Sequence, residues 1–271
     1  MTKREYAEQV AKIVGGEVTE VEKANGIIMT GIVCRNEGNM APTIYIDREY
    51  DNDTDIDEAA DIVKSVLKAN QPKEDFDVSI LTSWEKVRPL LKARLYNNRT
   101  TADVKRSAKQ YGFDDLNIVP YIDLDSYMPG GSTKVTEALV KEWGVTKRTV
   151  IDNALKNVQG DYTITSMSRI LAEMMGEDPD MIPDDIGMFV VSNKRKCLGA
   201  ISVIVGRDEI QRRFPKGYAV LPSSIHEVIV VPLTDEMSER NLTGMVNEVN
   251  ATQVAPEEVL GDKAYIFKGV A

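Results

Sequence analysis

The chain has 271 residues, of which 42% are hydrophobic and 28% charged, and its formal net charge is −10. This length allows one large domain or two ordinary ones, and the hydrophobic content excludes a wholly disordered chain. Because long-range electrostatics repel polyanions, the negative charge makes nucleic acid and anionic membranes unfavourable partners. It favours instead an acidic surface that binds a basic protein.

The sequence predicts a cytoplasmic protein that spans no membrane. No stretch approaches the roughly 18–20 apolar residues that a membrane helix needs, and the N-terminal segment lacks the apolar run of a secretory signal. Without export, the two cysteines, Cys34 and Cys197, are expected to be free thiols rather than a disulfide.

Helices and a hairpin are predicted for the first quarter of the chain. Tyr6, Val10 and Ile13 form the apolar stripe of a helix. Asn25-Gly26 favours a tight hairpin turn because both residues tolerate positive φ. The expected elements are a helix over 2–13, strands over 18–23, 27–35 and 43–46, and a helix over 55–69.

Two prolines limit the predictions for the middle of the chain. Pro89 opposes both a long helix and a central strand, so residues 87–96 stay unassigned, with a short helix opening at Pro89 as one alternative. Pro120 lies in a strand predicted over 118–124 and indicates that this strand is at the edge of a sheet.

The turn-rich segment Met128–Gly131 is the predicted boundary between two halves. The N-terminal α+β half covers 1–128 and the C-terminal α+β half covers 129–271, and the alternative is one continuous domain. Since strands and helices are mixed without strict alternation, the predicted fold class is α+β, with mixed or antiparallel sheets and flanking helices.

Hydroxyl side chains mark the expected helix starts in the second half: Ser132 or Thr133, then Thr146, then Ser166. The corresponding helices are expected to end near Trp143, Val158 and Met175. The remaining expected elements are strands over 187–192, 198–205, 217–221, 226–232 and 264–268, and helices over 207–213 and 236–249.

The segment LPSSIHEVIVVP, residues 221–232, is the most distinctive stretch of the chain. Four other stretches accompany it, namely 42–46, 143–146, 192–193 with 199–200, and 254–260. Together these stretches resemble an uncharacterised bacterial family that is described only as a domain of unknown function. The resemblance spans most of the chain. It implies genes near the accessory genes of mobile elements, and it implies no defined activity, catalytic residue or cofactor.

His226 is the only histidine in the chain, and it follows Ser223 and Ser224 closely. A hydrolase would need the imidazole within hydrogen-bond reach of a serine hydroxyl, with a carboxylate to orient the ring. The segment lacks the Gly-x-Ser-x-Gly elbow, and in a strand over 226–232 His226 and Glu227 would point to opposite faces. A loop that enters a buried strand is the simpler interpretation, and a hydrolase centred on these residues is kept as an alternative.

Two acidic loops are candidate surfaces for the basic partner. The first resembles a calcium loop, but Ile56 and Ile62 occupy the positions of the required glycine and of the bidentate glutamate. An exposed loop before a helix N-terminus, where the helix dipole favours carboxylates, is the simpler interpretation. The candidate partner-binding residues are Asp51, Asp53, Asp55, Asp57, Glu58, Glu177, Asp178 and Asp180.

Residues 136–155 have the spacing of a helix-turn-helix, with Gly144 at the turn. Lys147, Arg148 and Thr149 would begin the recognition helix, where base and phosphate contacts are made. A DNA-binding regulator is therefore an alternative function, although the acidic chain opposes it.

The remaining motifs do not support a cofactor or metal site. Residues 129–134 resemble a phosphate-binding loop in composition, but they lack the Gly-x-x-x-x-Gly-Lys spacing, so this hypothesis is set aside. One histidine and two distant cysteines supply a zinc site poorly, whereas a carboxylate-only magnesium site stays open. We expect no cofactor. The leading hypothesis is a non-enzymatic interaction or regulatory protein with an acidic surface.

Overall fold

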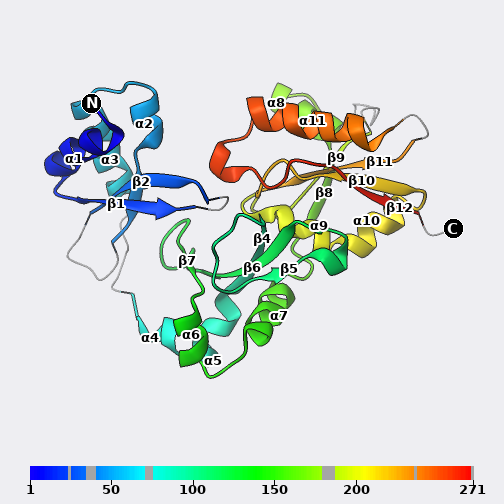
Figure 1. The fold of residues 1–271 in the computed structure, drawn as a ribbon, viewed down its shortest axis with the longest axis horizontal. Coiled ribbons are helices and arrows are strands. Elements are labelled where there is room, and N and C mark those ends of the chain that lie inside the picture. The colour runs from blue at the N-terminus through cyan, green and yellow to red at the C-terminus, as the bar shows by residue number, and fades with distance from the viewer. Residues whose placement is uncertain (24–25, 35–40, 71–75, 179–186, 235–236, 270–271) are drawn as a thin grey trace.

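The computed structural model describes residues 1–23, 26–34, 41–70, 76–178, 187–234 and 237–269 (Figure 1). Every strand pair in this part of the chain is antiparallel, and the strands form sheets of three, four and five strands that helices flank. The predicted α+β class with antiparallel sheets is therefore confirmed. Within the same residues, no helix is long and apolar enough to cross a membrane.

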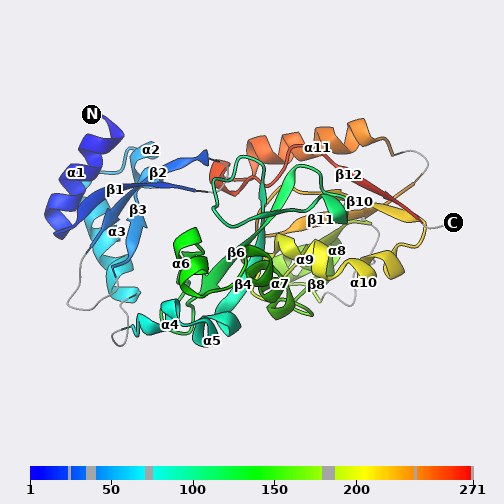
Figure 2. The same ribbon diagram turned by 60° about the horizontal axis from the view of Figure 1, so that its bottom comes forward.

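The described residues among the first 70 form a unit that we call the N-terminal lobe, at one end of the molecule (Figures 1 and 2). Its elements are α1 (Lys3–Val14), β1 (Glu17–Glu22), β2 (Ile28–Val33), β3 (Thr43–Tyr45), α2 (Asp47–Asp51) and α3 (Ile56–Ala69). They confirm the predicted helices, hairpin and third strand, although turn residues 24 and 25 lie outside the described residues. Val10, Ile32 and Val63 belong to a buried cluster whose members all come from this lobe.

The central sheet corrects the prediction that Pro120 lies in an edge strand. Its elements are α4 (Ser79–Thr82), α5 (Trp84–Val87), β4 (Leu91–Asn97), β5 (Arg106–Ser107), β6 (Leu116–Asp123) and β7 (Ser132–Lys134). Strand β6 pairs with β4 along one side and with both β5 and β7 along the other. Proline fits there because β5 reaches only residues 117–118 and β7 only residues 121–123, so no neighbour on that side needs the missing N–H.

The unassigned stretch over residues 87–96 contains two different structures. A 3₁₀ turn, Arg88–Leu90, holds Pro89 in its first turn, where proline is tolerated, and β4 follows directly. The local sequence could not separate these structures because the proline belongs to the first and the apolar residues to the second.

Met128–Gly131, the predicted boundary, is the turn that connects β6 to β7 within one sheet, and Leu124 N donates to Gly131 O at 2.9 Å. The largest buried cluster contains residues on both sides of this turn, from Phe76 to Tyr265. Turn-forming residues mark a chain reversal inside a domain as readily as a linker. The buried residues therefore group into the N-terminal lobe and a larger remainder, rather than into halves that meet at this turn.

Two helices pack beside the central sheet, α6 (Glu137–Glu142) and α7 (Lys147–Asn157). Thr136 caps α6, in place of the predicted Ser132 or Thr133, because those two residues pair with β6 as part of β7. Thr146 caps α7 by accepting a hydrogen bond from Thr149 N at 3.1 Å, as predicted.

The C-terminal sheet has the strand order β12-β10-β11-β9-β8. Its elements are β8 (Thr163–Ser166), α8 (Met167–Met175), β9 (Phe189–Ser192), α9 (Ser202–Val205), α10 (Arg207–Arg213), β10 (Gly217–Leu221), β11 (Val228–Pro232), α11 (Glu239–Thr252) and β12 (Tyr265–Lys268). Leu242 of α11 packs with Leu221 on one face, whereas Ile210 of α10 belongs with Val220 to the main cluster. Ser166 caps α8 as predicted.

Residues 198–205 were predicted as a strand, and this prediction is wrong. They form a 3₁₀ turn, Gly199–Ile201, followed by α9. The turn is held by two backbone bonds, from Gly199 N to His226 O at 2.9 Å and from Ala200 N to Ile225 O at 3.2 Å. Burial on all sides overrides the β propensity of the isoleucine and valine residues.

Tyr265 links the C-terminal sheet to the central sheet, because its hydroxyl donates a hydrogen bond to the Asp115 carboxylate. Lys263 pairs with the neighbouring Asp114 at 2.8 Å. Burial, reinforced by the bond to Asp115, raises the pKa of the Tyr265 phenol. The folded state therefore favours the neutral phenol.

We expect the free energy of unfolding to fall as the pH rises above about 10, where unfolded tyrosines ionise. The folded Tyr265 keeps its proton beyond that pH, so unfolding releases a proton and alkali favours the unfolded state. Tyr265→Phe should cost about 1–3 kcal/mol at pH 7, through the lost bond to a carboxylate, and should flatten the decline above pH 10. Urea unfolding between pH 7 and 11.5 measures both quantities, and an equally steep decline in the variant would contradict the assignment.

Candidate functional site

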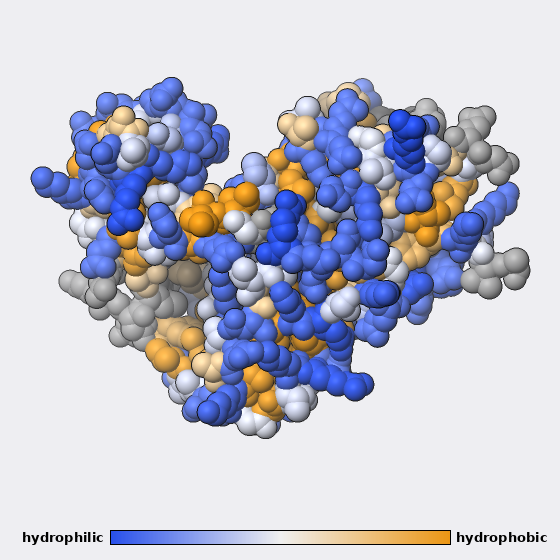
Figure 3. All heavy atoms as spheres, in the orientation of Figure 1, coloured by the Kyte–Doolittle hydropathy of each residue, from blue (hydrophilic) through white to orange (hydrophobic). Residues whose placement is uncertain are grey.

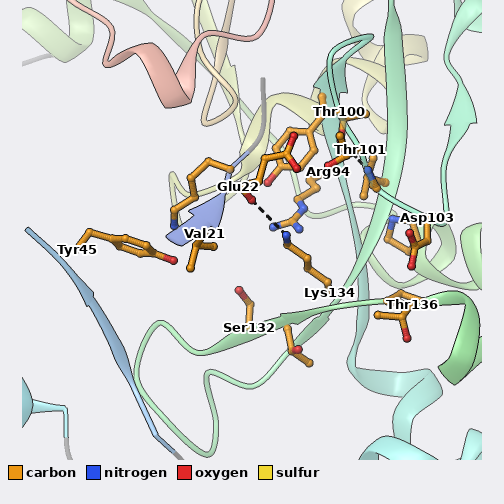
Figure 4. Close-up of a pocket in the computed structure, with 17 residues that line it drawn as sticks. Val21, Glu22, Tyr45, Arg94, Thr100, Thr101, Asp103, Ser132, Lys134 and Thr136 are labelled. Atoms are coloured by element: carbon orange, nitrogen blue, oxygen red, sulfur yellow. Dashed lines mark hydrogen bonds between the residues drawn. The ribbon is translucent and has the colours of Figure 1, made fainter. Parts of the chain in front are cut away.

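A pocket of about 440 Å³ lies between the N-terminal lobe and the central sheet, and we call it the interlobe pocket (Figure 4). The lobe contributes the end of β1 and Tyr45 of β3. The remainder contributes β4, β6, β7 and the loop over residues 100–103. Most of the lobe surface in view is hydrophilic, and a notch lies between the upper part of the lobe and the rest of the molecule (Figure 3).

The gap in the central sheet explains why a pocket forms at this place. Val119 and Pro120 lie between the stretches of β6 that pair with β5 and with β7, and both residues line the pocket. Because proline cannot donate to a ladder, the sheet stays open here. Pro120, which from the sequence alone predicts an edge strand, therefore lies in the wall of the pocket.

Arg94 is the buried charge of the interlobe pocket. It alternates with Ala93 and Leu95 along β4, which places its side chain on the opposite face of the sheet from theirs. Only 9% of Arg94 is exposed, and none of the described residues accepts a hydrogen bond from its Nε. The guanidinium carbon lies 4.7 Å from the ring centre of Tyr96 and 4.9 Å from that of Tyr121.

The two tyrosines beside Arg94 do not neutralise it. Burial raises the pKa of both phenols, so both rings stay neutral at physiological pH. They hold the guanidinium through cation–π contacts, which leave the N–H groups in its plane free for an acceptor. Among the described residues, no carboxylate forms an ion pair with Arg94.

Two lysines bring further positive charge to the pocket. Lys134 of β7 donates from Nζ to the backbone carbonyl of Glu22 at 3.2 Å, which connects the central sheet to the lobe. Lys23 places Nζ 3.6 Å from the ring centre of Tyr45. In the described part of the chain neither ammonium pairs with a carboxylate. Figure 4 shows Arg94, Lys134 and Glu22 gathered at the centre of the view.

Acidic and hydroxyl side chains complete the lining. Glu22 and Asp103 line the pocket from exposed positions, so water screens their charges more than that of Arg94. Five hydroxyl residues also line it: Thr100, Thr101, Ser132, Thr133 and Thr136. The pocket thus combines one buried cation, two lysines and several hydroxyl donors.

The structure places His226 away from this pocket and uses both of its ring nitrogens. Nδ1 accepts from Leu198 N at 3.1 Å, and Nε2 lies 3.1 Å from a carboxylate oxygen of Glu258. Ser224 Oγ accepts from His226 N at 3.0 Å, and Ser223 is buried. Neither ring nitrogen faces a serine hydroxyl, so the geometry favours a structural role for these three residues in joining loops.

Residues 136–155 form two helices with Gly144 at positive φ between them, as a helix-turn-helix requires. The cations proposed to meet DNA are engaged within the protein. Lys147 pairs with Glu137 and donates to Asp103 O at 3.0 Å, and Arg148 lies 3.6 Å from Asp152. Thr149 bonds to the cap residue Thr146. These carboxylates reduce the positive potential of the helix start.

The first acidic loop begins α3, as predicted. Asp55 caps the helix by accepting from Asp57 N at 2.9 Å, and Asp51 pairs with Lys3 at 3.4 Å. Asp53, Asp57 and Glu58 are exposed. In the second loop Glu177 and Asp178 are exposed, and Asp180 lies outside the described residues. Both ribbon views place α3 and α8 in different parts of the molecule, so Glu177 and Asp178 do not adjoin the first loop.

Neither cysteine forms a disulfide, and Cys34 is buried while Cys197 is exposed. In the ranges that the structure describes, no three His, Cys, Asp or Glu side chains are grouped closely enough to hold a metal ion.

Arg94 was not identified as a site residue from the sequence. One motif that does contribute to the pocket is the stretch 129–134, which was rejected as a phosphate-binding loop. Ser132, Thr133 and Lys134 from that glycine-rich stretch line the pocket, although as a strand rather than as a loop before a helix. An arginine within an apolar strand could have identified Arg94 as a candidate site residue, because a charged residue is rarely buried without a partner.

Comparison with known proteins gives a family and no activity. No curated protein and no solved structure matches the chain. One family model matches residues 2–269, and its description is a family of unknown function, DUF5688. Because the match covers nearly the whole chain, the protein belongs to the family of unknown function DUF5688.

Proposed function

We propose that this protein is a binding protein whose ligand occupies the interlobe pocket. The observation that carries this proposal is that two separately packed parts of the chain jointly form one concave site. Small-molecule sites occur preferentially at such boundaries, and about 440 Å³ falls in their usual range. A ligand there would contact both parts and hold the N-terminal lobe against the central sheet.

Blocking the pocket tests this function without knowledge of the ligand. A metabolite library is screened by thermal shift against the wild-type protein, Ser132→Trp and Ser126→Trp. Both serines are exposed, and only Ser132 lines the pocket. We expect compounds that raise the melting temperature of the wild type and of Ser126→Trp, but not of Ser132→Trp. A library without such compounds, or equal stabilisation of all three proteins, would contradict the proposal.

Binding of a basic protein to the N-terminal lobe is a second candidate function. Residues 1–70 contain 8 Lys and Arg against 14 Asp and Glu, so most of the net negative charge of the chain belongs to this lobe. Asp53, Asp57 and Glu58 are exposed on it, where they would attract a basic surface. Replacing these three residues by lysine should abolish a partner interaction that is detected by co-purification, and an unchanged interaction would end the idea.

The cellular setting is part of the proposal. The family resemblance supports a bacterial protein that is encoded near mobile-element genes and acts as an interaction or regulatory component of the cytoplasm.

A further inference from the structure

Arg94 has more hydrogen-bond donors than the protein satisfies. A guanidinium carries five N–H donors and no acceptor, and buried polar groups in native proteins are nearly always bonded. Among the described residues, none accepts a hydrogen bond from this guanidinium, and its Nε is buried. An acceptor from outside the chain would complete this site.

The surroundings of Arg94 select a negatively charged acceptor. Lys134 lines the same pocket, and among the described residues its ammonium group donates only to a neutral carbonyl, that of Glu22. Among the described residues neither cation forms an ion pair with a carboxylate, so the two repel each other, and an anion between them would offset this repulsion. Planar guanidinium groups bind carboxylates and phosphates through two parallel hydrogen bonds, which a bound anion can form here.

The hydroxyl groups of the pocket distinguish between these two anions. Thr100 Oγ1 accepts from Ala102 N at 3.4 Å, and Thr136 Oγ1 accepts from Leu139 N at 3.3 Å. Since each oxygen already accepts a backbone bond, each hydroxyl hydrogen remains free to donate. Together with Arg94 and Lys134, these hydroxyls offer donors to more than the two oxygens of a carboxylate. The three terminal oxygens of a phosphate ester can use them all.

We propose that the interlobe pocket binds the phosphate group of a small phosphorylated molecule, with Arg94 and Lys134 as its charged ligands. This inference rests on the binding function proposed above and names the chemical class of its ligand. The buried fork of Arg94 fixes the orientation of the phosphate. Lys134 adds charge and, through its bond to Glu22, connects the bound anion to the N-terminal lobe. The pocket volume leaves room for the organic part of the ligand.

Calorimetric titration of the full chain with pyrophosphate tests the inference. We expect one site, with affinity reduced about 10- to 100-fold by Arg94→Met, because a charge-assisted pair of bonds is lost. Lys134→Gln should weaken binding less, since one point charge is removed. The matched controls are Arg212→Met and Lys141→Gln, both exposed and outside the pocket, and they should bind as the wild type does. Succinate should bind at least about 10-fold more weakly than pyrophosphate.

Two results would overturn the inference, and they differ from failure of the proposed function. Pyrophosphate that does not bind, or that binds Arg94→Met as tightly as the wild type, excludes Arg94 as a phosphate ligand. Succinate that binds better than pyrophosphate assigns the pocket to carboxylates instead. In either case, library compounds that are blocked by Ser132→Trp would still support the pocket as a binding site. Circular dichroism of each variant confirms that the fold is retained.

Discussion

Gly199→Ala is expected to lower the free energy of unfolding by about 3 kcal/mol or more. A Cβ at this position would lie 2.3 Å from Ser192 Oγ, 2.5 Å from Asn193 N and 2.7 Å from His226 O. Two of these three atoms belong to the backbone, so no side-chain rotation relieves the contacts. Gly199 N also donates to His226 O, and movement of the turn would break that bond.

Gly244→Ala is the matched control for this prediction. Gly244 lies within α11, and a Cβ there has no atom of another element within 4 Å. Alanine loses less backbone entropy than glycine when a helix forms, so this variant should be more stable by about 0.5–1 kcal/mol. Chemical unfolding followed by circular dichroism measures both proteins. Equal small effects at the two positions would mean that the turn over residues 199–201 packs less closely than described.

Arg94→Met is expected to stabilise the ligand-free protein while it weakens phosphate binding. The variant deletes a buried cation that has no acceptor among the described residues, which costs about 1–3 kcal/mol in the wild type. It also loses the stacking on Tyr96 and Tyr121, worth about 1–2 kcal/mol. The net gain should be about 1 kcal/mol, or a rise of about 2–4 °C in melting temperature. Binding sites often sacrifice stability in this way.

A structural role for Arg94 predicts the opposite sign. If the guanidinium served only to pack the two tyrosines, its removal would lower the melting temperature and leave ligand binding intact. Arg212 is exposed and pairs with Glu209, so Arg212→Met should change the free energy of unfolding by less than about 0.5 kcal/mol. It is the control for the loss of an arginine outside the pocket. Thermal unfolding in phosphate-free buffer separates the alternatives, and addition of pyrophosphate should then stabilise the wild type and Arg212→Met much more than Arg94→Met.

The sequence predicted elements well wherever local signals agree with the packing. The cap residues Thr146 and Ser166 begin helices, and the hairpin of β1 and β2 forms where Asn-Gly was found. Local reasoning failed at residues 198–205, where apolar β-branched residues occupy a buried turn and helix. Their propensity favours a strand, but contacts with distant segments decide the structure.

The candidate site was harder to predict than the fold, because it is built from separate segments. Arg94, Lys134 and Glu22 come from three strands and meet only after the N-terminal lobe packs beside the central sheet. From the sequence alone, Pro120 predicts an edge strand. The sequence does not show that β5 and β7 pair with different stretches of β6 and leave a gap at Pro120. The glycine-rich stretch 129–134 lacks the Gly-x-x-x-x-Gly-Lys spacing, but that spacing identifies only one kind of phosphate site.

Phosphate binding by Arg94 can be followed directly through the ¹⁵N–¹H signal of its Nε–H group, which is identified by its absence from the spectrum of Arg94→Met. If a phosphate completes this buried site, the signal should shift during titration with pyrophosphate and saturate with the dissociation constant measured by calorimetry. A signal that stays fixed while pyrophosphate binds elsewhere, or while none binds, would contradict phosphate binding at Arg94.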